Sequence, residues 1–212
     1  MFDKKVLVAG AGKSGICASE QLLRNGEQVV LFDENPKGTL TETVILEKLG
    51  FDKKPEALTI WLGALTDELL ADISCMVISP GIPVDAPFAL KVKEGIPVWS
   101  EIELAYTYEK GTVAAITGTN GKTTTTTLVG EIMKAYNDKT FVVGNIGIPY
   151  TSLSDQSSAD SVTVAEISSF QLETIHTFRP HVSAILNITP DHLNRHYTFE
   201  NYANCKLDIT KN

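Results

Sequence analysis

TVAAITGTNGKTT, at residues 112–124, joins a short apolar run to a turn that contains two glycines. The branched and small residues of 112–116 predict a buried strand, and the pattern from Lys122 to about Tyr136 predicts a helix. A strand that enters a helix through such a turn presents backbone N–H groups and the positive end of the helix dipole to an anion. The sequence therefore predicts an α/β domain with a phosphate-binding loop at this point.

The loop also carries the side chains that ATP chemistry needs. Lys122 is expected to neutralise the β- and γ-phosphates, and the Thr123 hydroxyl is expected to hold Mg²⁺. The general pattern of these loops has a glycine at position 116, where this chain has Ile116, so the match is partial. The residues predicted to bind ATP are Gly118, Thr119, Asn120, Gly121, Lys122, Thr123 and Thr124.

Apolar runs alternate with helical patterns along the whole chain, which favours parallel sheets covered by helices on both faces. The pattern restarts after Glu109-Lys110-Gly111, so we expect a Rossmann-like parallel sheet domain at 1–109 and a P-loop-type α/β ATP-binding domain at 110–212. Strands are expected at 6–9, 28–32, 58–62, 76–79, 98, 112–116, 141–143, 161–166 and 182–188. Helices are expected through Ile16, Leu22 and Leu23, and at 41–49, 66–70, 86–93, 101–108, 122–136 and 198–209.

A second glycine loop lies near the N-terminus. Gly10-Ala11-Gly12-Lys13-Ser14-Gly15 matches G-x-G-x-x-G between an expected strand and an expected helix. Asp33 closes the next strand, where dinucleotide-binding folds place a ribose-binding acid. The motif alone predicts a diphosphate near a helix N-terminus, and NAD is only one of several ligands of that kind.

Polar side chains follow two expected strands of the second domain. Glu166 closes the run 162–165, where a phosphoryl-transfer site needs a carboxylate for Mg²⁺. The segment 187–196 follows another strand end and contains two histidines, an acid and an arginine. We therefore expect Glu166 to bind a metal ion and 187–196 to be a loop with dense polar chemistry.

The composition argues against several classes of function. The net charge is −8, from 18 basic and 26 acidic side chains, so a nucleic-acid partner is not expected. The three cysteines share no metal-ligand spacing and indicate no oxidising compartment. No apolar run approaches the roughly 20 residues of a membrane-spanning helix, and the N-terminus lacks the apolar run of a signal peptide. We expect a cytoplasmic monomer without a membrane partner.

Taken together, these segments resemble the Mur ligase family. The motifs that carry the resemblance are GTNGKTT at 118–124, EISSFQL at 166–172, NITPDHLNRH at 187–196, GAGKSG at 10–15, SPGIP at 79–83 and GNIG at 144–147. The resemblance runs along the whole chain, and this set of motifs in this order is highly specific. It implies that the first domain binds the UDP part of a nucleotide-sugar precursor and that the second binds ATP with two Mg²⁺ ions.

The resemblance implies an amide-bond-forming ligase of peptidoglycan synthesis. ATP would phosphorylate the terminal carboxylate of UDP-N-acetylmuramoyl-L-alanine, leaving ADP. The amine of D-glutamate would then attack the acyl phosphate, and phosphate would leave. Because a carboxylate is a poor acyl donor, ATP supplies the leaving group, and catalysis depends on positioning and on charge neutralisation by Lys122 and Mg²⁺.

The resemblance also implies roles for particular residues. Thr123 and Glu166 would hold the first Mg²⁺, His192 would help to hold the second, and Lys206 would be carbamylated to form an anionic metal ligand. The implied catalytic residues are Lys122, Glu166, His192 and Lys206. The implied substrate-binding residues are Ser14, Gly15, Asp33, Glu34 and Gly81 for uridine diphosphate and Asn145, Ser168 and Gln171 for the muramoyl part. Asn194 departs from the family, because many members carry aspartate there, so its role is open.

Three alternatives stay open. An NAD-dependent oxidoreductase would account for the first loop and Asp33, but it has no use for an ATP-type loop. A nucleotide-sugar-binding module without catalysis would not need Lys122, Glu166 and His192. The third is a sister ligase, such as one that adds another amino acid or the folate polyglutamate enzyme. The latter would share the phosphate loop but should lack the first domain.

The second domain has three or four expected strands, where about four to six are usual. Members of the family have more of this domain and a third domain, which contributes the amino-acid site. We therefore expect the 212-residue chain to be a fragment that has no ligase activity of its own.

Overall fold

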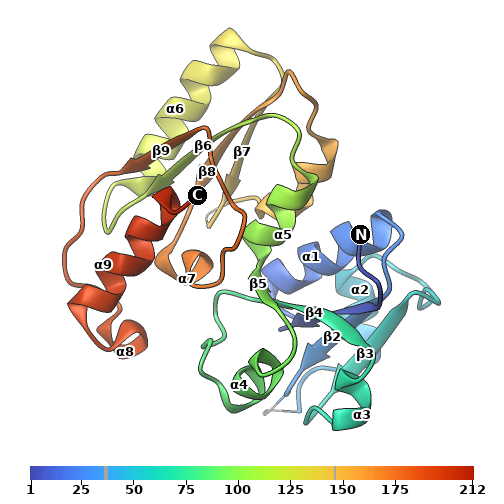
Figure 1. Cartoon of the computed structure of the whole chain (residues 1–212). Helices are drawn as coiled ribbons and strands as arrows, with labels where there is room; N and C mark the ends of the chain where they lie inside the picture. The colour runs from blue at the N-terminus through green and yellow to red at the C-terminus, as the bar shows by residue number, and fades with distance from the viewer. Residues whose placement is uncertain (36–37, 146) are drawn as a thin grey trace. The chain divides into compact units, whose positions relative to one another are not determined.

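The computed structural model describes residues 1–35, 38–145 and 147–212. The chain forms two compact units, Met1–Glu101 and Ile102–Asn212, and passes from one to the other at the start of helix α5 (Glu101–Tyr108). In Figure 1 the first unit runs from blue to green and the second from green to red. The domain boundary expected from the sequence, at Glu109-Lys110-Gly111, lies just after the end of α5 and stays a prediction.

The first unit contains a five-stranded parallel sheet in the order β3-β2-β1-β4-β5. Its strands are β1 (Lys5–Ala9), β2 (Val29–Asp33), β3 (Leu58–Leu62), β4 (Ile73–Ile78) and β5 (Val98–Ser100). The central strands are continuous apolar runs because both faces of the sheet are covered. The chain moves outward from β1 to β3 and then returns to β4, so the strand order reverses between β1 and β4. Open α/β sheets bind ligands at such a reversal.

Short helices connect these strands. They are α1 (Lys13–Arg24), α2 (Glu42–Lys48), α3 (Asp67–Leu70) and α4 (Pro87–Lys93). Thr41 and Thr66 begin α2 and α3, since each hydroxyl accepts a hydrogen bond from the backbone N–H three residues later. Pro87 occupies the first turn of α4, where its missing N–H has no intrahelical partner to lose. The sequence thus sets the start of α2, α3 and α4 locally.

The second unit contains a four-stranded parallel sheet in the order β7-β8-β6-β9. Its strands are β6 (Thr112–Thr117), β7 (Thr140–Gly144), β8 (Val162–Glu166) and β9 (Val182–Ile185). Its helices are α6 (Lys122–Tyr136), α7 (Ser169–Leu172), α8 (Leu193–His196) and α9 (Phe199–Leu207), with 3₁₀ turns at Tyr150–Ser152, Ser154–Gln156 and Asp208–Thr210. Because β6 lies between β8 and β9, the segments that follow these three strands meet at one edge of the sheet.

The α/β class with two parallel sheets is confirmed, and every expected strand and helix has a counterpart. The ends differ: β4 begins at Ile73 rather than at 76, and β9 ends at Ile185 rather than at 188. The second difference has a physical reason, since the side chain of Asn187 bonds to the phosphate loop instead of a strand. Helices α7 and α8 were not expected, because four residues are too few to show a helical period.

Within the described ranges, no helix has both the length and the apolar character that crossing a membrane would require.

Candidate functional site

Two glycines shape the loop between β6 and α6 that the sequence predicts to bind phosphate. Gly118 has a φ of 153° and Gly121, the N-cap of α6, has a φ of 82°, values that residues with side chains rarely adopt. A Cβ atom at Gly118 would also lie 3.1 Å from Cβ of Leu186. The loop therefore favours glycine at both positions, and it delivers Lys122 and Thr123 as the first residues of α6.

Lys122 lies folded over this loop. Its Nζ donates to the carbonyl oxygen of Gly118 at 2.9 Å and to that of Thr119 at 3.0 Å. These contacts hold the ammonium group close to the N-terminus of α6, where the helix dipole also attracts anions. The placement suits a phosphate lysine, and contact with ATP stays a prediction.

Thr123 and Glu166, the residues predicted to hold the first Mg²⁺, are hydrogen-bonded to each other. The Thr123 hydroxyl donates to Oε2 of Glu166 at 2.9 Å, and Nδ2 of Asn145 donates to Oε1 at 3.1 Å. Glu166 is buried, with 2% of its surface exposed. A hydroxyl and a buried carboxylate are hard oxygen donors, which Mg²⁺ prefers.

Lys206 lies beside the same loop and is buried, with 2% of its surface exposed. Its Nζ donates to the carbonyl of Gly118 at 2.9 Å and lies 4.8 Å from the centre of the Tyr202 ring. Burial lowers the pKa of Lys206 to about 8, and the nearby charge of Lys122 adds to this effect. The ammonium groups of Lys122 and Lys206 thus share one carbonyl oxygen, so this end of the loop concentrates positive charge.

Thr119 and Asn187 tie the phosphate loop to the segment that follows β9. Oγ1 of Thr119 accepts from the Thr189 N–H at 3.0 Å, donates to its carbonyl at 3.1 Å, and lies 2.9 Å from the Tyr202 hydroxyl. The amide of Asn187 accepts from the N–H of Asn120 and donates to its carbonyl, both at 3.0 Å. These bonds fix two loops and α9 together.

His192 ends this segment in a left-handed backbone conformation, with a φ of 51°. Its ring packs on Phe170, with 4.9 Å between ring centres, and its Nε2 lies 3.6 Å from Oδ2 of Asp191. About half of the side chain is exposed. Left-handed residues other than glycine are uncommon, and such strain concentrates at functional sites.

A cavity of about 220 Å³ brings these groups together. It is lined by Lys122, Asn145, Ser168, Ser169, Phe170, Asp191, His192, Tyr202 and Lys206. The site residues predicted from the sequence that line it are Lys122, Asn145, Ser168, His192 and Lys206. Glu166 adjoins the cavity through its bond to Asn145. The structure therefore brings five of the predicted residues of this unit to one cavity, with Glu166 beside it.

Two predicted residues of this unit have local structural roles. Gln171 is buried and forms a capping box with Ser168 at the start of α7: its Oε1 accepts from the Ser168 N–H at 2.7 Å. Their contact with the muramoyl part stays a prediction. Asn194 is exposed on α8. Of the GNIG motif, Ile146 lies outside the described residues.

Gly10 and Gly15 shape the first glycine loop, between β1 and α1. Gly10 has a φ of 99°, and a Cβ atom at Gly15 would lie 1.8 Å from the carbonyl oxygen of Gly10. At the end of β2, Asp33 accepts from the N–H of Ala11 at 3.0 Å through Oδ2 and from that of Asn35 at 2.8 Å through Oδ1. Asp33 thus anchors the loop, whereas its predicted contact with the ligand is untested.

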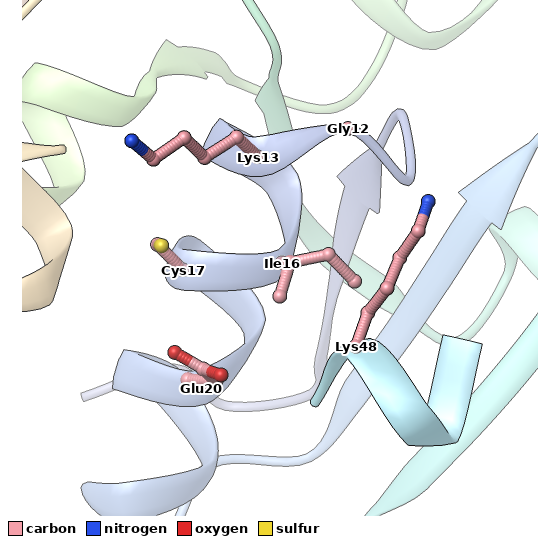
Figure 2. Close-up of a pocket in the computed structure, with 6 residues that line it drawn as sticks. All are labelled: Gly12, Lys13, Ile16, Cys17, Glu20 and Lys48. Atoms are coloured by element: carbon pink, nitrogen blue, oxygen red, sulfur yellow. The ribbon is translucent and has the colours of Figure 1, made fainter. Parts of the chain in front are cut away.

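Two cavities flank this loop. One of about 240 Å³, at the reversal between β1 and β4, includes the predicted residues Asp33, Glu34 and Gly81. The other, of about 390 Å³, is lined by Gly12, Lys13, Ile16, Cys17, Glu20 and Lys48 (Figure 2). Ser14 and Gly15 line neither of these two cavities and lie in the first turn of α1.

The sequence analysis missed several residues of the two sites. Asp191, Ser169 and Phe170 lie within the quoted motifs, so the motifs did contain a signal for them. Tyr202 and Lys48 had none, because only folding brings them near the loops. Figure 2 shows Lys48 extending from α2 toward the loop, where its Nζ donates to the Ala11 carbonyl at 3.2 Å.

Two family models match the chain. The model described as Mur ligase MurD-like, N-terminal domain, matches residues 4–100, and the model described as Mur ligase middle domain matches residues 116–212. The matched ranges contain both glycine loops and the segments that line the 220 Å³ cavity.

Curated relatives match along the whole chain. A UDP-N-acetylmuramoylalanine--D-glutamate ligase of Lachnoclostridium phytofermentans is 57% identical over 100% of this chain and 46% of its own length. The protein with the same name from Lachnospira eligens is 58% identical over 99% of this chain and 46% of its own length. The chain thus spans about half the length of these curated relatives.

A solved structure, a pseudomurein peptide ligase type C from Methanothermus fervidus, matches with a TM-score of 0.43 and 22% identity, over 99% of this chain and 43% of that chain. The two domain models and the identities to the curated relatives identify the family, and the structural match adds nothing to that identification. The chain belongs to the Mur ligase family, with a MurD-like N-terminal domain followed by a Mur ligase middle domain.

Proposed function

We propose that the protein containing this chain is an ADP-forming ligase that adds D-glutamate to UDP-N-acetylmuramoyl-L-alanine in peptidoglycan synthesis. The names of the curated relatives support the choice of substrates. The observation that carries the proposal is the cavity where Lys122, His192 and Lys206 meet, next to the bonded pair Thr123 and Glu166.

The oxygen donors of Thr123 and Glu166 suit one Mg²⁺ ion. Asn145 already donates to the other carboxylate oxygen of Glu166, which orients the carboxylate toward the hydroxyl. Bound Mg²⁺ would neutralise part of the charge on the transferring phosphoryl group. The chain itself supplies the orientation of the two oxygen ligands.

A second Mg²⁺ ion near His192 and Lys206 fits only if the Lys206 ammonium is removed, because a cation would repel it. Carbamylation achieves this: the neutral amine forms a bond to CO₂, a proton leaves to solvent, and an anionic oxygen ligand results. We propose this modification in the functional protein. If it occurs, added acetate or formate should restore part of the activity that Lys206→Ala removes, and an inactive variant without any rescue would argue against it.

Lys122 would exchange its two loop carbonyls for the phosphates of ATP, since both contacts are to neutral oxygens and a phosphate is charged. The N–H groups at the start of α6 would bind the same phosphates. In the first unit, the loop from Gly10 to Gly15 would hold the diphosphate of the nucleotide sugar. We place the reaction in the cytoplasm, because ATP and both substrates are small soluble molecules. We also propose that the protein acts as a monomer.

The experiment uses the full-length protein with ATP, Mg²⁺ and UDP-N-acetylmuramoyl-L-alanine. D-glutamate, L-glutamate, L-lysine and meso-diaminopimelate are supplied one at a time, and phosphate release and product mass are measured. We expect rapid turnover with D-glutamate alone. Product with a different amino acid would identify a sister ligase, and tighter binding of NAD than of UDP without any product would favour the oxidoreductase.

A further inference from the structure

Glu173, His196 and Cys205 form a cluster of metal-ligating side chains that none of the roles above uses. Glu173 caps the C-terminus of α7, His196 ends α8, and Cys205 lies in α9. One carboxylate oxygen, one imidazole nitrogen and the sulfur all lie within 4.8 Å of one another. Glu173 precedes His196 by 23 positions and Cys205 by 32 positions, and the fold brings the three side chains together.

We propose that this cluster is a binding site for a transition-metal dication of the Zn²⁺ type, separate from the Mg²⁺ sites. One thiolate, one imidazole and one carboxylate are three protein ligands of the kinds that zinc takes, with water as the fourth. Mg²⁺ prefers oxygen ligands and does not suit a sulfur and nitrogen set. The ligand chemistry therefore distinguishes this site from the pair of Thr123 and Glu166.

The distances suit a small tetrahedral ion. Oε1 of Glu173 and Nδ1 of His196 are 3.5 Å apart, and two ligands bound at about 2.0–2.1 Å with a tetrahedral angle lie roughly 3.3 Å apart. The sulfur of Cys205 lies within 4.8 Å of the other two ligand atoms, and it would bind the ion at about 2.3 Å. Its proton would leave to solvent as the metal–sulfur bond forms.

His196 is already oriented for metal binding. It is buried, with 3% of its surface exposed, and its Nε2 lies 3.0 Å from the Ser169 hydroxyl oxygen. If Nε2 carries the hydrogen and donates it to Ser169, the lone pair is on Nδ1, which faces Glu173. A hydrogen bond from the far ring nitrogen to an oxygen is the usual outer-shell partner of a metal-bound histidine.

Arg195 also contacts Glu173 and must be compatible with the ion. Its Nη2 donates to Oε2 at 2.6 Å, and its Nε donates to Oε1 at 3.2 Å. A metal ion would take Oε1 and displace the longer contact, while the shorter one to Oε2 stays. The guanidinium group also packs on the Phe170 ring at 5.1 Å, so it keeps a second contact.

The site would join three short elements, of which α7 and α8 have four residues each. Helices of this length have little stability of their own. An ion held by Glu173, His196 and Cys205 would therefore stabilise the segment that carries His192 and the helix that carries Lys206.

The test is titration of the metal-free, tag-free protein with Co²⁺, followed by absorption. We expect one Co²⁺ per chain to give a sulfur-to-cobalt charge-transfer band in the near ultraviolet, and we expect Zn²⁺ to displace this ion and to raise Tm. Cys205→Ala should abolish the band and the Zn²⁺-dependent rise in Tm. Cys17→Ala, which removes another partly exposed cysteine, should leave both unchanged.

Two further variants make the outcome decisive. Glu173→Gln keeps the shape of the side chain but removes its charge, and it should weaken Co²⁺ binding at least tenfold while far-ultraviolet circular dichroism reports an intact fold. Ser169→Ala removes only the outer-shell oxygen and should weaken binding more mildly. Absence of a thiolate band in the parent, or a band that survives Cys205→Ala, would overturn the proposal.

Discussion

In the proposed mechanism Lys122 has the most direct role of any single residue, because its ammonium group would contact the transferring phosphoryl group. Replacing it with alanine should lower turnover of the full-length protein by roughly 100-fold or more, which corresponds to about 3 kcal/mol. Phosphate release under saturating substrates measures this. Lys134→Ala is the matched control, since Lys134 is on the same helix and forms an exposed ion pair with Glu131. Activity of Lys122→Ala within threefold of the parent would contradict the assignment.

Lys206 should destabilise the unmodified protein at neutral pH. Its pKa is about 8 in the folded state and near 10.5 when exposed, so the unfolded chain binds the proton more tightly. The destabilisation by Lys206 has its full size below pH 8, and it disappears as the pH rises from 8 to 10.5. In metal-free and CO₂-free buffer, Lys206→Met should therefore have a higher Tm than the parent at pH 7, and this advantage should shrink toward pH 10. An advantage that does not change with pH would show that proton binding is not its cause.

At the scale of elements, the loop between β1 and α1 depends on a close backbone approach. A methyl group at Gly15 would lie 1.8 Å from the Gly10 carbonyl oxygen, whereas nothing lies within 4 Å of a methyl group at Gly12. Gly15→Ala should therefore lower Tm by several degrees and abolish UDP binding, and Gly12→Ala should change Tm only slightly. Calorimetry on both variants measures these effects. Equal Tm values for the two variants would contradict the role given to Gly15.

The sequence predicted the long elements well because strands such as β1 and helices such as α6 have clear periods and glycine boundaries. It predicted Lys122, Glu166 and His192 because each lies within a motif that follows a strand. It could not place Tyr202 next to Thr119, since their contact spans 83 positions and depends on packing of α9. The short helices α7 and α8 were not predicted for a different reason. Each has only four residues, which is too few to show a helical period, and a capping box defines the start of α7.

For the whole molecule, the main expectation concerns the catalytic activity of the 212-residue chain. The chain spans 46% of the length of its curated relatives, and it contains the two glycine loops that are predicted to bind nucleotides. We expect the 212-residue chain to bind ATP and UDP but to form no product over many turnovers, because a reactive acyl phosphate needs a closed site that excludes water. Incubation with all substrates, followed by mass spectrometry of the product, measures this. Sustained product formation would contradict it.

The proposed function requires that the protein activates a carboxylate by phosphorylating it. The most direct test uses UDP-N-acetylmuramoyl-L-alanine with ¹⁸O in its terminal carboxylate, the full-length protein, ATP, Mg²⁺ and D-glutamate. A carboxylate oxygen that attacks the γ-phosphate keeps its bond to phosphorus when the amine displaces the phosphate. Mass spectrometry should therefore find one ¹⁸O atom in each released phosphate and none in ADP. Released phosphate without ¹⁸O, or ¹⁸O in AMP, would contradict the acyl-phosphate mechanism.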